Sequence, residues 1–206
     1  MMNISGNYHT EEREVEVVRR IFDEQSIPYV KIEKYARADD GDVCVHLEGG
    51  KTLLIEVKEE RYNRFTKFGD LGIDYISAFQ FKQGVNSDDW KRQQQPERVN
   101  EFWQSIDTSY NFKYGKVFYS KSDLWLFFVL DPDNDFYYCK FFDGAFMTSR
   151  EFRDYLESNC QFTVNIKPPT QQSYYDRHNS ACFFLNRNDN VLNQCEVDLQ
   201  ELIDRL

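Results

Sequence analysis

The chain has 206 residues, enough for one domain with a substantial core, and its 18 phenylalanines and 13 tyrosines can fill much of that core. No apolar run is long enough to span a membrane, and the N-terminus lacks the pattern of a secretory signal. Five scattered cysteines without a C-x-x-C pair argue against a zinc site or a disulfide framework and favour a cytoplasmic protein. The net charge of −10 is opposite to the basic surface expected of a nucleic-acid-binding protein.

The first predicted elements are a helix and a strand. Thr10 is a candidate N-cap followed by glutamates in the first turn, where the helix dipole favours acids. An apolar stripe at i, i+3, i+4 spacing continues to about Gln25, and Pro28 then ends the helical pattern. Residues 29–35 are expected to form the first strand of a sheet.

Residues 42–58 predict a β-hairpin around which the rest of the chain is organised. Apolar and polar residues alternate in both arms, which meet at a Gly-Gly turn. Side chains two apart on a strand share a face, and directly opposed residues lie about 4.5–5.5 Å apart at Cβ. Two carboxylates and an ammonium are therefore expected to converge as a candidate metal site. The expected register pairs Leu47 with Lys51, Asp42 with Glu56 and Asp40 with Lys58.

The segment after the hairpin is polar and carries several cations. Residues 59–67 interleave charged and aromatic side chains, so Arg61, Arg64 and Lys67 are candidate phosphate contacts near the carboxylates. A solvated loop explains the same composition equally well.

The remainder of the chain predicts alternating strands and helices. Gly69 and Gly72 favour a turn, and alternation over residues 73–81 then indicates a strand. Further on we expect a helix over 88–107 interrupted at Pro96, strands over 117–119, 124–130 and 136–142, a turn over 131–135, a helix over 148–158, a polar loop over 168–180, an edge strand over 181–185 and a terminal helix over 197–206.

Three segments, in order, resemble the PD-(D/E)xK nuclease superfamily and its phage-like branch. Asp42 followed by Glu56-Val57-Lys58 is similar to the motif that names the superfamily, with Gly41 in place of its proline. Residues 66–75 are similar to a segment that follows the E-x-K strand in phage-like members, and residues 120–125 resemble the opening of a later strand there.

The resemblance implies a restriction-endonuclease-like α/β fold, with a central mixed β-sheet flanked by helices. We expect a single domain over residues 1–206. Its core would span about residues 10–142, and residues 143–206 would form a C-terminal elaboration.

The resemblance also implies a role for each residue of the motif. Asp42 and Glu56, with the Val57 carbonyl, would bind Mg²⁺ or Mn²⁺ through hard oxygen ligands. Lys58 would orient or deprotonate the attacking water, or act through its charge alone.

Other residues are expected to assist this site. Glu14 on the first helix is the candidate for a further acid near the metal, although the helix glutamates fit a solvated surface as well. Asp74 occupies the position of an acid in the second similar segment, and Lys121 is a further candidate DNA contact.

These expectations describe a Mg²⁺-dependent deoxyribonuclease that hydrolyses DNA phosphodiester bonds, with DNA as partner and no membrane association. Within the nucleases, the alternative is a Holliday-junction or branched-DNA resolvase, which would act as a homodimer. From a different class, the alternative is a catalytically inactive nuclease-fold module that binds a protein, since an acidic surface suits a DNA mimic.

Overall fold

The computed structural model describes residues 8–35, 41–90, 98–166 and 179–205. The chain forms two compact units, each assembled from separated stretches of sequence. Unit 1 comprises residues 1–63, 120–147 and 190–206, and unit 2 comprises residues 64–119 and 148–189. No helix among the described residues is both long and apolar enough to cross a membrane.

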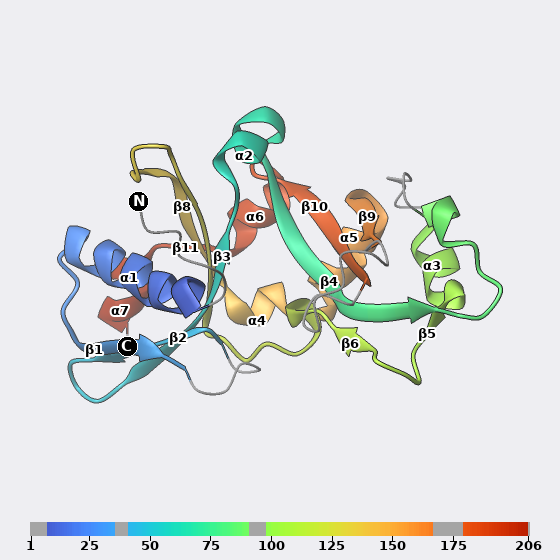
Figure 1. Cartoon of the computed structure of the whole chain (residues 1–206). Coiled ribbons are helices and arrows are strands. Elements are labelled where there is room, and N and C mark those ends of the chain that lie inside the picture. The colour runs from blue at the N-terminus through green and yellow to red at the C-terminus, as the bar shows by residue number, and fades with distance from the viewer. Residues whose placement is uncertain (1–7, 36–40, 91–97, 167–178, 206) are drawn as a thin grey trace. The chain divides into compact units, whose positions relative to one another are not determined.

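Unit 1 is a six-stranded mixed sheet with helices packed against it (Figure 1). The strands run in the order β1-β2-β3-β7-β8-β11, and β3 and β7 are parallel while the other neighbours are antiparallel. The protein is therefore mixed α/β, as expected. The elements of unit 1 are α1 (Tyr8–Glu24), β1 (Tyr29–Lys34), β2 (Val43–Leu47), β3 (Thr52–Glu59), β7 (Leu124–Leu130), β8 (Phe136–Asp143), α4 (Gly144–Met147), α6 (Asn190–Cys195), β11 (Glu196–Val197) and α7 (Leu199–Arg205).

The core of unit 1 joins α1 to one face of this sheet. Val18 and Phe22 of α1 are fully buried, and they share a cluster with Val43, Ile55 and Leu126 of three successive strands. The predicted helix and its apolar stripe are thus confirmed, but the predicted N-cap is wrong, because α1 begins at Tyr8 and Thr10 lies within it. Burying a Val, Leu, Ile or Phe side chain stabilises a fold by roughly 1.5–3 kcal/mol, so this face carries much of the stability of unit 1.

Asp123 aligns β7 beside the hairpin. Its Oδ2 accepts a hydrogen bond from the Leu54 N–H at 2.8 Å, and its own N–H donates to the Leu54 carbonyl at 2.8 Å. Gly144, which follows β8, lies directly against the Ser122 backbone: a Cβ on Gly144 would stand 1.8 Å from the Ser122 carbonyl oxygen. These contacts set the register in which Glu56 faces Trp125.

Unit 2 is built around the long strand β4 and an aromatic core. Its sheet runs in the order β5-β4-β10-β9, with β6 also paired to β4. The Tyr75 ring contacts four other rings, and its hydroxyl donates to Glu157. Unit 2 contains β4 (Asp70–Phe81), the 3₁₀ helix Ser87–Trp90, α3 (Val99–Ser105), β5 (Ile106–Asp107), β6 (Lys113–Tyr114), the 3₁₀ helix Lys116–Phe118, α5 (Arg150–Asn159), β9 (Gln161–Asn165) and β10 (Asn179–Asn186), and α2 (Tyr62–Phe68) lies where the sequence passes from unit 1 to unit 2.

Two predicted loops and turns have a different structure. The segment expected as a solvated loop contains α2, whose Phe65 is buried. Gly69 ends this helix in a left-handed conformation (φ +69°) and donates to the Phe65 carbonyl at 2.7 Å, which is an αL C-cap. The expected turn at Gly69 and Gly72 is wrong, because Gly72 already pairs with Phe184 inside β4.

Other predictions in unit 2 are wrong for reasons of tertiary pairing. Residues 117–119 do not form a strand: Gly115 lies against the Asp74 backbone and the chain turns into a 3₁₀ helix. Residues 181–185 are not an edge strand, because β10 pairs with β4 on one side and β9 on the other. One helix was expected over 88–107. The described residues of this span form the 3₁₀ helix Ser87–Trp90, α3 and β5, and residues 91–97 lie outside the described part.

The remaining elements agree closely with the sequence. The strands expected over 124–130 and 136–142 are β7 and β8, and the turn between them is held by Asp131, whose Oδ1 accepts from two backbone N–H groups. The helix expected over 148–158 is α5, capped by Ser149. The terminal helix begins at Leu199, since Val197 pairs in β11. Most of the polar loop over 168–180 lies outside the described residues.

Candidate functional site

The hairpin has the register that the sequence predicts. Val43 pairs with Ile55 and His46 with Thr52, and the Leu47 N–H donates to the Lys51 carbonyl at 2.8 Å. This register sets Asp42, just before β2, beside Glu56 on β3. The predicted partner of Lys58, Asp40, lies outside the described residues.

Asp42 is tied to the hairpin by three hydrogen bonds. Its N–H donates to the Ile55 carbonyl at 3.0 Å, its carbonyl accepts from the Tyr35 N–H at 3.0 Å, and its Oδ2 accepts from the Val57 N–H at 2.9 Å. The last bond brings one carboxylate oxygen to the backbone between Glu56 and Lys58. The orientation of Asp42 is therefore set by the β3 backbone.

Gly41 replaces the proline of the resembled motif for a conformational reason. Its φ of +143° cannot be adopted by proline, whose ring holds φ near −65°. A Cβ at this position would also lie 3.1 Å from the Ser122 Oγ. In this chain the turn into Asp42 requires glycine.

Glu56 and Lys58 project from the same face of β3 and form an ion pair. Lys58 Nζ lies 2.9 Å from Glu56 Oε1, and the Glu56 side chain is fully buried while that of Lys58 is 20% exposed. Lys58 Nζ also stands 5.9 Å from the centre of the Trp125 ring. A buried carboxylate requires a cation nearby, and the Lys58 ammonium meets that need.

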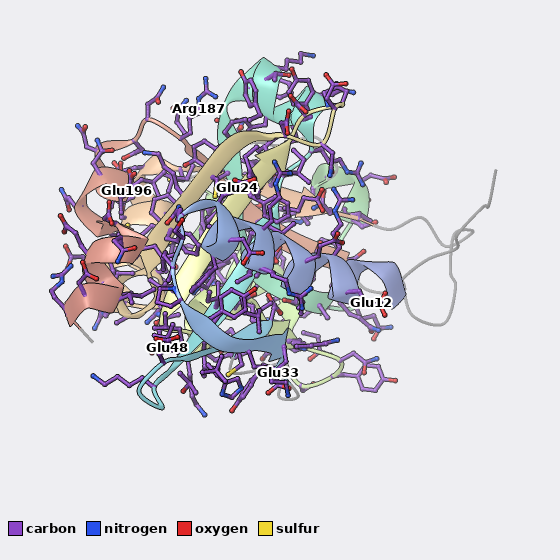
Figure 2. The ribbon with its side chains drawn as sticks, turned by 90° about the vertical axis from the view of Figure 1, so that its left-hand side faces the viewer. Glu12, Glu24, Glu33, Glu48, Arg187 and Glu196 are labelled. Atoms are coloured by element: carbon purple, nitrogen blue, oxygen red, sulfur yellow. The ribbon has the colours of Figure 1, made fainter. Side chains whose placement is uncertain are left out.

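Glu14 of α1 belongs to the same electrostatic group. Burial and, after it, the Asp42 carboxylate raise the pKa of its carboxyl to about 7, against the opposing effects of Lys34 and Lys58. Its helix neighbour Glu12, by contrast, is exposed at the N-terminal part of α1 (Figure 2). The choice of Glu14 among the α1 glutamates thus agrees with its burial and with its proximity to Asp42.

This donor set suits a hard cation through carboxylate and carbonyl oxygens. Asp42, Glu56 and the Val57 carbonyl offer only oxygen, which Mg²⁺ prefers, and Mg²⁺ usually retains several waters beside one or two carboxylates. Within the described ranges, no group of three or more His, Cys, Asp or Glu side chains is arranged to hold a metal.

The predicted cationic contacts Arg61, Arg64 and Lys67 lie in or next to α2. Arg61 belongs to unit 1, and Arg64 and Lys67 belong to unit 2. The Arg64 guanidinium lies 3.8 Å from the Phe184 ring centre and Lys67 Nζ lies 4.8 Å from that of Phe68. Arg61 is exposed just before α2, and Lys121 is exposed in the segment before β7. Their contact with DNA stays a prediction.

Asp74, which the sequence predicted, and Arg187, which it did not, both belong to unit 2. Asp74 is exposed on β4, opposite Cys182 of β10, so it belongs to unit 2 while Asp42 and Glu56 belong to unit 1. Arg187, shown in Figure 2, follows β10 and places its guanidinium 5.0 Å from the Phe65 ring centre. Its position beside α2 comes from strand pairing, so no local sequence signal could have grouped it with Arg64.

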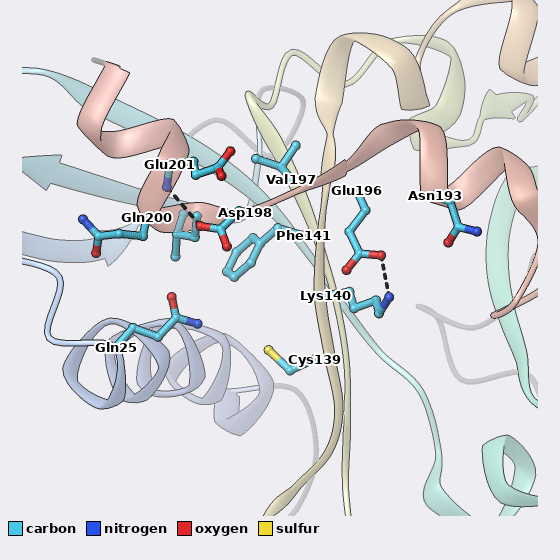
Figure 3. Close-up of a pocket in the computed structure, with 11 residues that line it drawn as sticks. Gln25, Cys139, Lys140, Phe141, Asn193, Glu196, Val197, Asp198, Gln200 and Glu201 are labelled. Atoms are coloured by element: carbon cyan, nitrogen blue, oxygen red, sulfur yellow. Dashed lines mark hydrogen bonds and ion pairs between the residues drawn. The ribbon is translucent and has the colours of Figure 1, made fainter.

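A cavity of about 720 Å³ lies in another part of unit 1 and does not contain the candidate site (Figure 3). Lys140 and Glu196 form an ion pair at 2.5 Å on its wall, and Asp198 accepts from the Glu201 N–H at 3.0 Å. These polar groups hold β8, β11 and α7 together. The residues that line the cavity are Gln25, Cys139, Lys140, Phe141, Asn193, Glu196, Val197, Asp198, Leu199, Gln200 and Glu201.

Comparisons of the chain with protein-family models, with curated proteins and with solved structures found no match.

Proposed function

We propose that the chain is a metal-dependent nuclease that hydrolyses DNA phosphodiester bonds at a site built from Asp42, Glu56 and Lys58. The observation that carries this proposal is the convergence of the three side chains at the open end of the hairpin. Asp42 is bonded to the Val57 N–H, and the flanking Glu56 and Lys58 are 2.9 Å apart. We further propose that the six-stranded mixed sheet with α1 against it is a restriction-endonuclease-like fold.

In this proposal Asp42, Glu56 and the Val57 carbonyl hold Mg²⁺. A bound Mg²⁺ would supply a water of lowered pKa and positive charge for the phosphate oxygens. The hydrogen bond from the Val57 N–H to one Asp42 oxygen keeps that carboxylate oriented.

Lys58 changes partner in this scheme. Its ammonium lies against Glu56, so an ion bound by Glu56 would compete with Lys58 for the same carboxylate. An ammonium displaced by a few ångström can donate to a phosphate oxygen or orient the attacking water. The flexible four-carbon stem of lysine permits this movement, whereas the planar arginine group suits a fixed pair.

Glu14 completes the proposed chemistry as a proton acceptor. A general base works best when its pKa lies near the operating pH, and the pKa of Glu14 is raised to about 7. Its position near Asp42 follows from the packing of α1 on β1 and β2. We assign it to receive the proton of the attacking water.

The test is cleavage of supercoiled, linear and single-stranded DNA in Mg²⁺ or Mn²⁺. We expect the native chain to cut at least one of these and Asp42→Ala and Lys58→Ala to lose activity. Matched controls on the same hairpin are Glu59→Gln and Lys51→Ala, whose side chains are exposed and outside the site. Calorimetry with Mg²⁺ and Mn²⁺ measures metal binding separately.

The outcomes separate the proposal from its alternatives. Cutting that Asp42→Ala and Lys58→Ala abolish, with both controls active, supports the nuclease and its site together. Metal binding without cleavage of these substrates directs the assay to branched DNA, as for a resolvase. A chain that neither cuts DNA nor binds metal contradicts the nuclease proposal and favours the protein-binding module.

A further inference from the structure

Unit 2 carries a cluster of aromatic rings that reaches its surface. The Tyr114 ring centre lies 4.7 Å from that of Phe112 and 4.7 Å from that of Phe118. Trp103 stands 6.0 Å from Phe112 and 6.3 Å from Tyr114. We call Trp103, Phe112, Tyr114 and Phe118 the aromatic shelf.

The shelf combines a buried support with exposed rings. Tyr75 is fully buried beneath it, with its ring centre 5.0 Å from Phe118 and 5.8 Å from Trp103. Tyr114 is nevertheless 45% exposed, and Tyr110 in the preceding turn is 60% exposed. An exposed ring that packs on buried rings offers a preorganised aromatic face to a ligand.

The backbone keeps the shelf in place. Tyr114 pairs with Ile76 of β4, and the next residue, Gly115, donates its N–H to the Tyr75 carbonyl at 2.9 Å. A Cβ on Gly115 would stand 2.0 Å from the Asp74 carbonyl oxygen, so only glycine permits this approach. The ring of Tyr114 therefore does not depend on a flexible loop for its position.

Cations neighbour the shelf. Lys116 follows two residues after Tyr114, whereas the exposed Lys113 projects from the opposite face of β6. The Arg153 guanidinium lies 5.1 Å from the Phe118 ring centre, held there by hydrogen bonds to the Val117 and Thr148 carbonyls. Aromatic faces bordered by Lys and Arg are the chemistry by which proteins bind unpaired bases and the phosphates between them.

We propose that the aromatic shelf binds single-stranded DNA, with an unpaired base stacked on Tyr114 and a neighbouring phosphate contacted by Lys116. The choice of nucleic acid as ligand rests on the proposed nuclease function. The shelf adds the substrate class, because a base inside a duplex has no free face to offer. Single-stranded or locally opened DNA is therefore the preferred substrate.

The experiment measures binding by fluorescence anisotropy with labelled oligothymidylate, in EDTA, so that cleavage cannot interfere. We expect the native chain to bind this probe at least about tenfold more tightly than a duplex of the same length. Tyr114→Ala should weaken binding about tenfold and Tyr114→Phe should restore most of it, because phenylalanine keeps the ring face. The affinity for oligouridylate, measured in the same way, distinguishes DNA from RNA as the ligand.

The chain offers a matched control in Tyr137. Its side chain is 46% exposed, against 45% for Tyr114, and its ring also contacts a neighbouring ring, that of Tyr62 at 5.1 Å. Tyr137 lies on β8 in unit 1, so Tyr137→Ala should leave the affinity for oligothymidylate unchanged. Lys116→Ala should lower the slope of log affinity against log salt by about 0.7.

Three results would overturn the proposal. Equal affinity for duplex and single strand would remove the role of an unpaired base, and a much tighter oligouridylate complex would assign the shelf to RNA. Equal effects of Tyr114→Ala and Tyr137→Ala would show that the shelf makes no specific contribution to DNA binding. Because no metal is present, each result is independent of whether Asp42 and Glu56 support cleavage.

Discussion

The two units of this chain differ sharply in charge. Unit 1 contains 23 acidic and 12 basic residues, and unit 2 contains 12 acidic and 13 basic residues, so their formal charges are −11 and +1. The entire acidic excess of the chain belongs to the unit that holds Asp42 and Glu56. The net charge of −10 therefore does not describe unit 2, and it argues less strongly against a nucleic-acid ligand than the whole-chain value suggests.

The units also differ in what fills their cores. Unit 1 packs mainly Val, Ile and Leu between α1 and the sheet, and Glu56 of β3 is buried in it. Unit 2 packs rings upon rings around Tyr75 and carries some of them to its surface. We interpret unit 1 as the place of metal-assisted chemistry and unit 2 as a place of base recognition.

The largest expected effect tests this division of roles. Glu56→Gln should lower the cleavage rate at saturating DNA by about 10³-fold or more, because it removes a metal-binding charge from a water-excluded position. Tyr114→Ala should instead raise the KM for single-stranded DNA. Steady-state kinetics on both variants separate the two effects. If Glu56→Gln changed KM alone, the assignment of chemistry to unit 1 would be contradicted.

Core truncations compare the stability of the two units. Phe102→Ala in unit 2 and Leu126→Ala in unit 1 remove fully buried side chains, and should cost about 3–5 and about 2–5 kcal/mol respectively. Urea unfolding followed by far-UV circular dichroism measures both. A loss below about 1 kcal/mol at Phe102 would mean that the aromatic core is loosely packed.

The pH dependence of Glu14 links stability to activity. Its pKa is about 7 in the folded chain and 4.5 as the ordinary value, so folding favours the protonated form. Between these two values the unfolded chain binds fewer protons, and stability falls as pH rises from 4.5 to 7. Over the same range cleavage should increase as the base loses its proton.

Glu14→Gln should remove both effects. We expect the variant to be more stable than the native chain at pH 8 by about 1 kcal/mol, with no difference at pH 4, because glutamine does not ionise. Its cleavage rate should be low and should lack the rise near pH 7. Unfolding and rate profiles measured at several pH values check this, and an unchanged rate profile would remove Glu14 from the mechanism.

The smallest expected effects come from helix caps, one in each unit. Ser149 accepts from the Phe152 N–H at 3.0 Å to cap α5, and Asp198 accepts from the Glu201 N–H at 3.0 Å to cap α7. Ser149→Ala and Asp198→Ala should each cost about 1 kcal/mol. Thermal unfolding measures both, and a much larger loss at either position would reveal a role beyond capping.

Local patterns in the sequence were sufficient wherever neighbouring residues determine the structure. The apolar stripe of α1 and the Gly-Gly turn of the hairpin each act within a few residues, so helix and register could be predicted. The alternation over residues 42–58 was enough to place Asp42 beside Glu56, because a shift of one residue would have turned the buried faces outward.

The tertiary structure decided everything that depends on pairing between distant segments. β9 makes β10 an internal strand, Gly69 and the buried Phe65 close α2, and no spacing in the sequence separates unit 1 from unit 2. The raised pKa of Glu14 and the assembly of the aromatic shelf likewise arise from packing. Burial and contact depend on residues far apart in the chain, and these are properties that composition and periodicity do not encode.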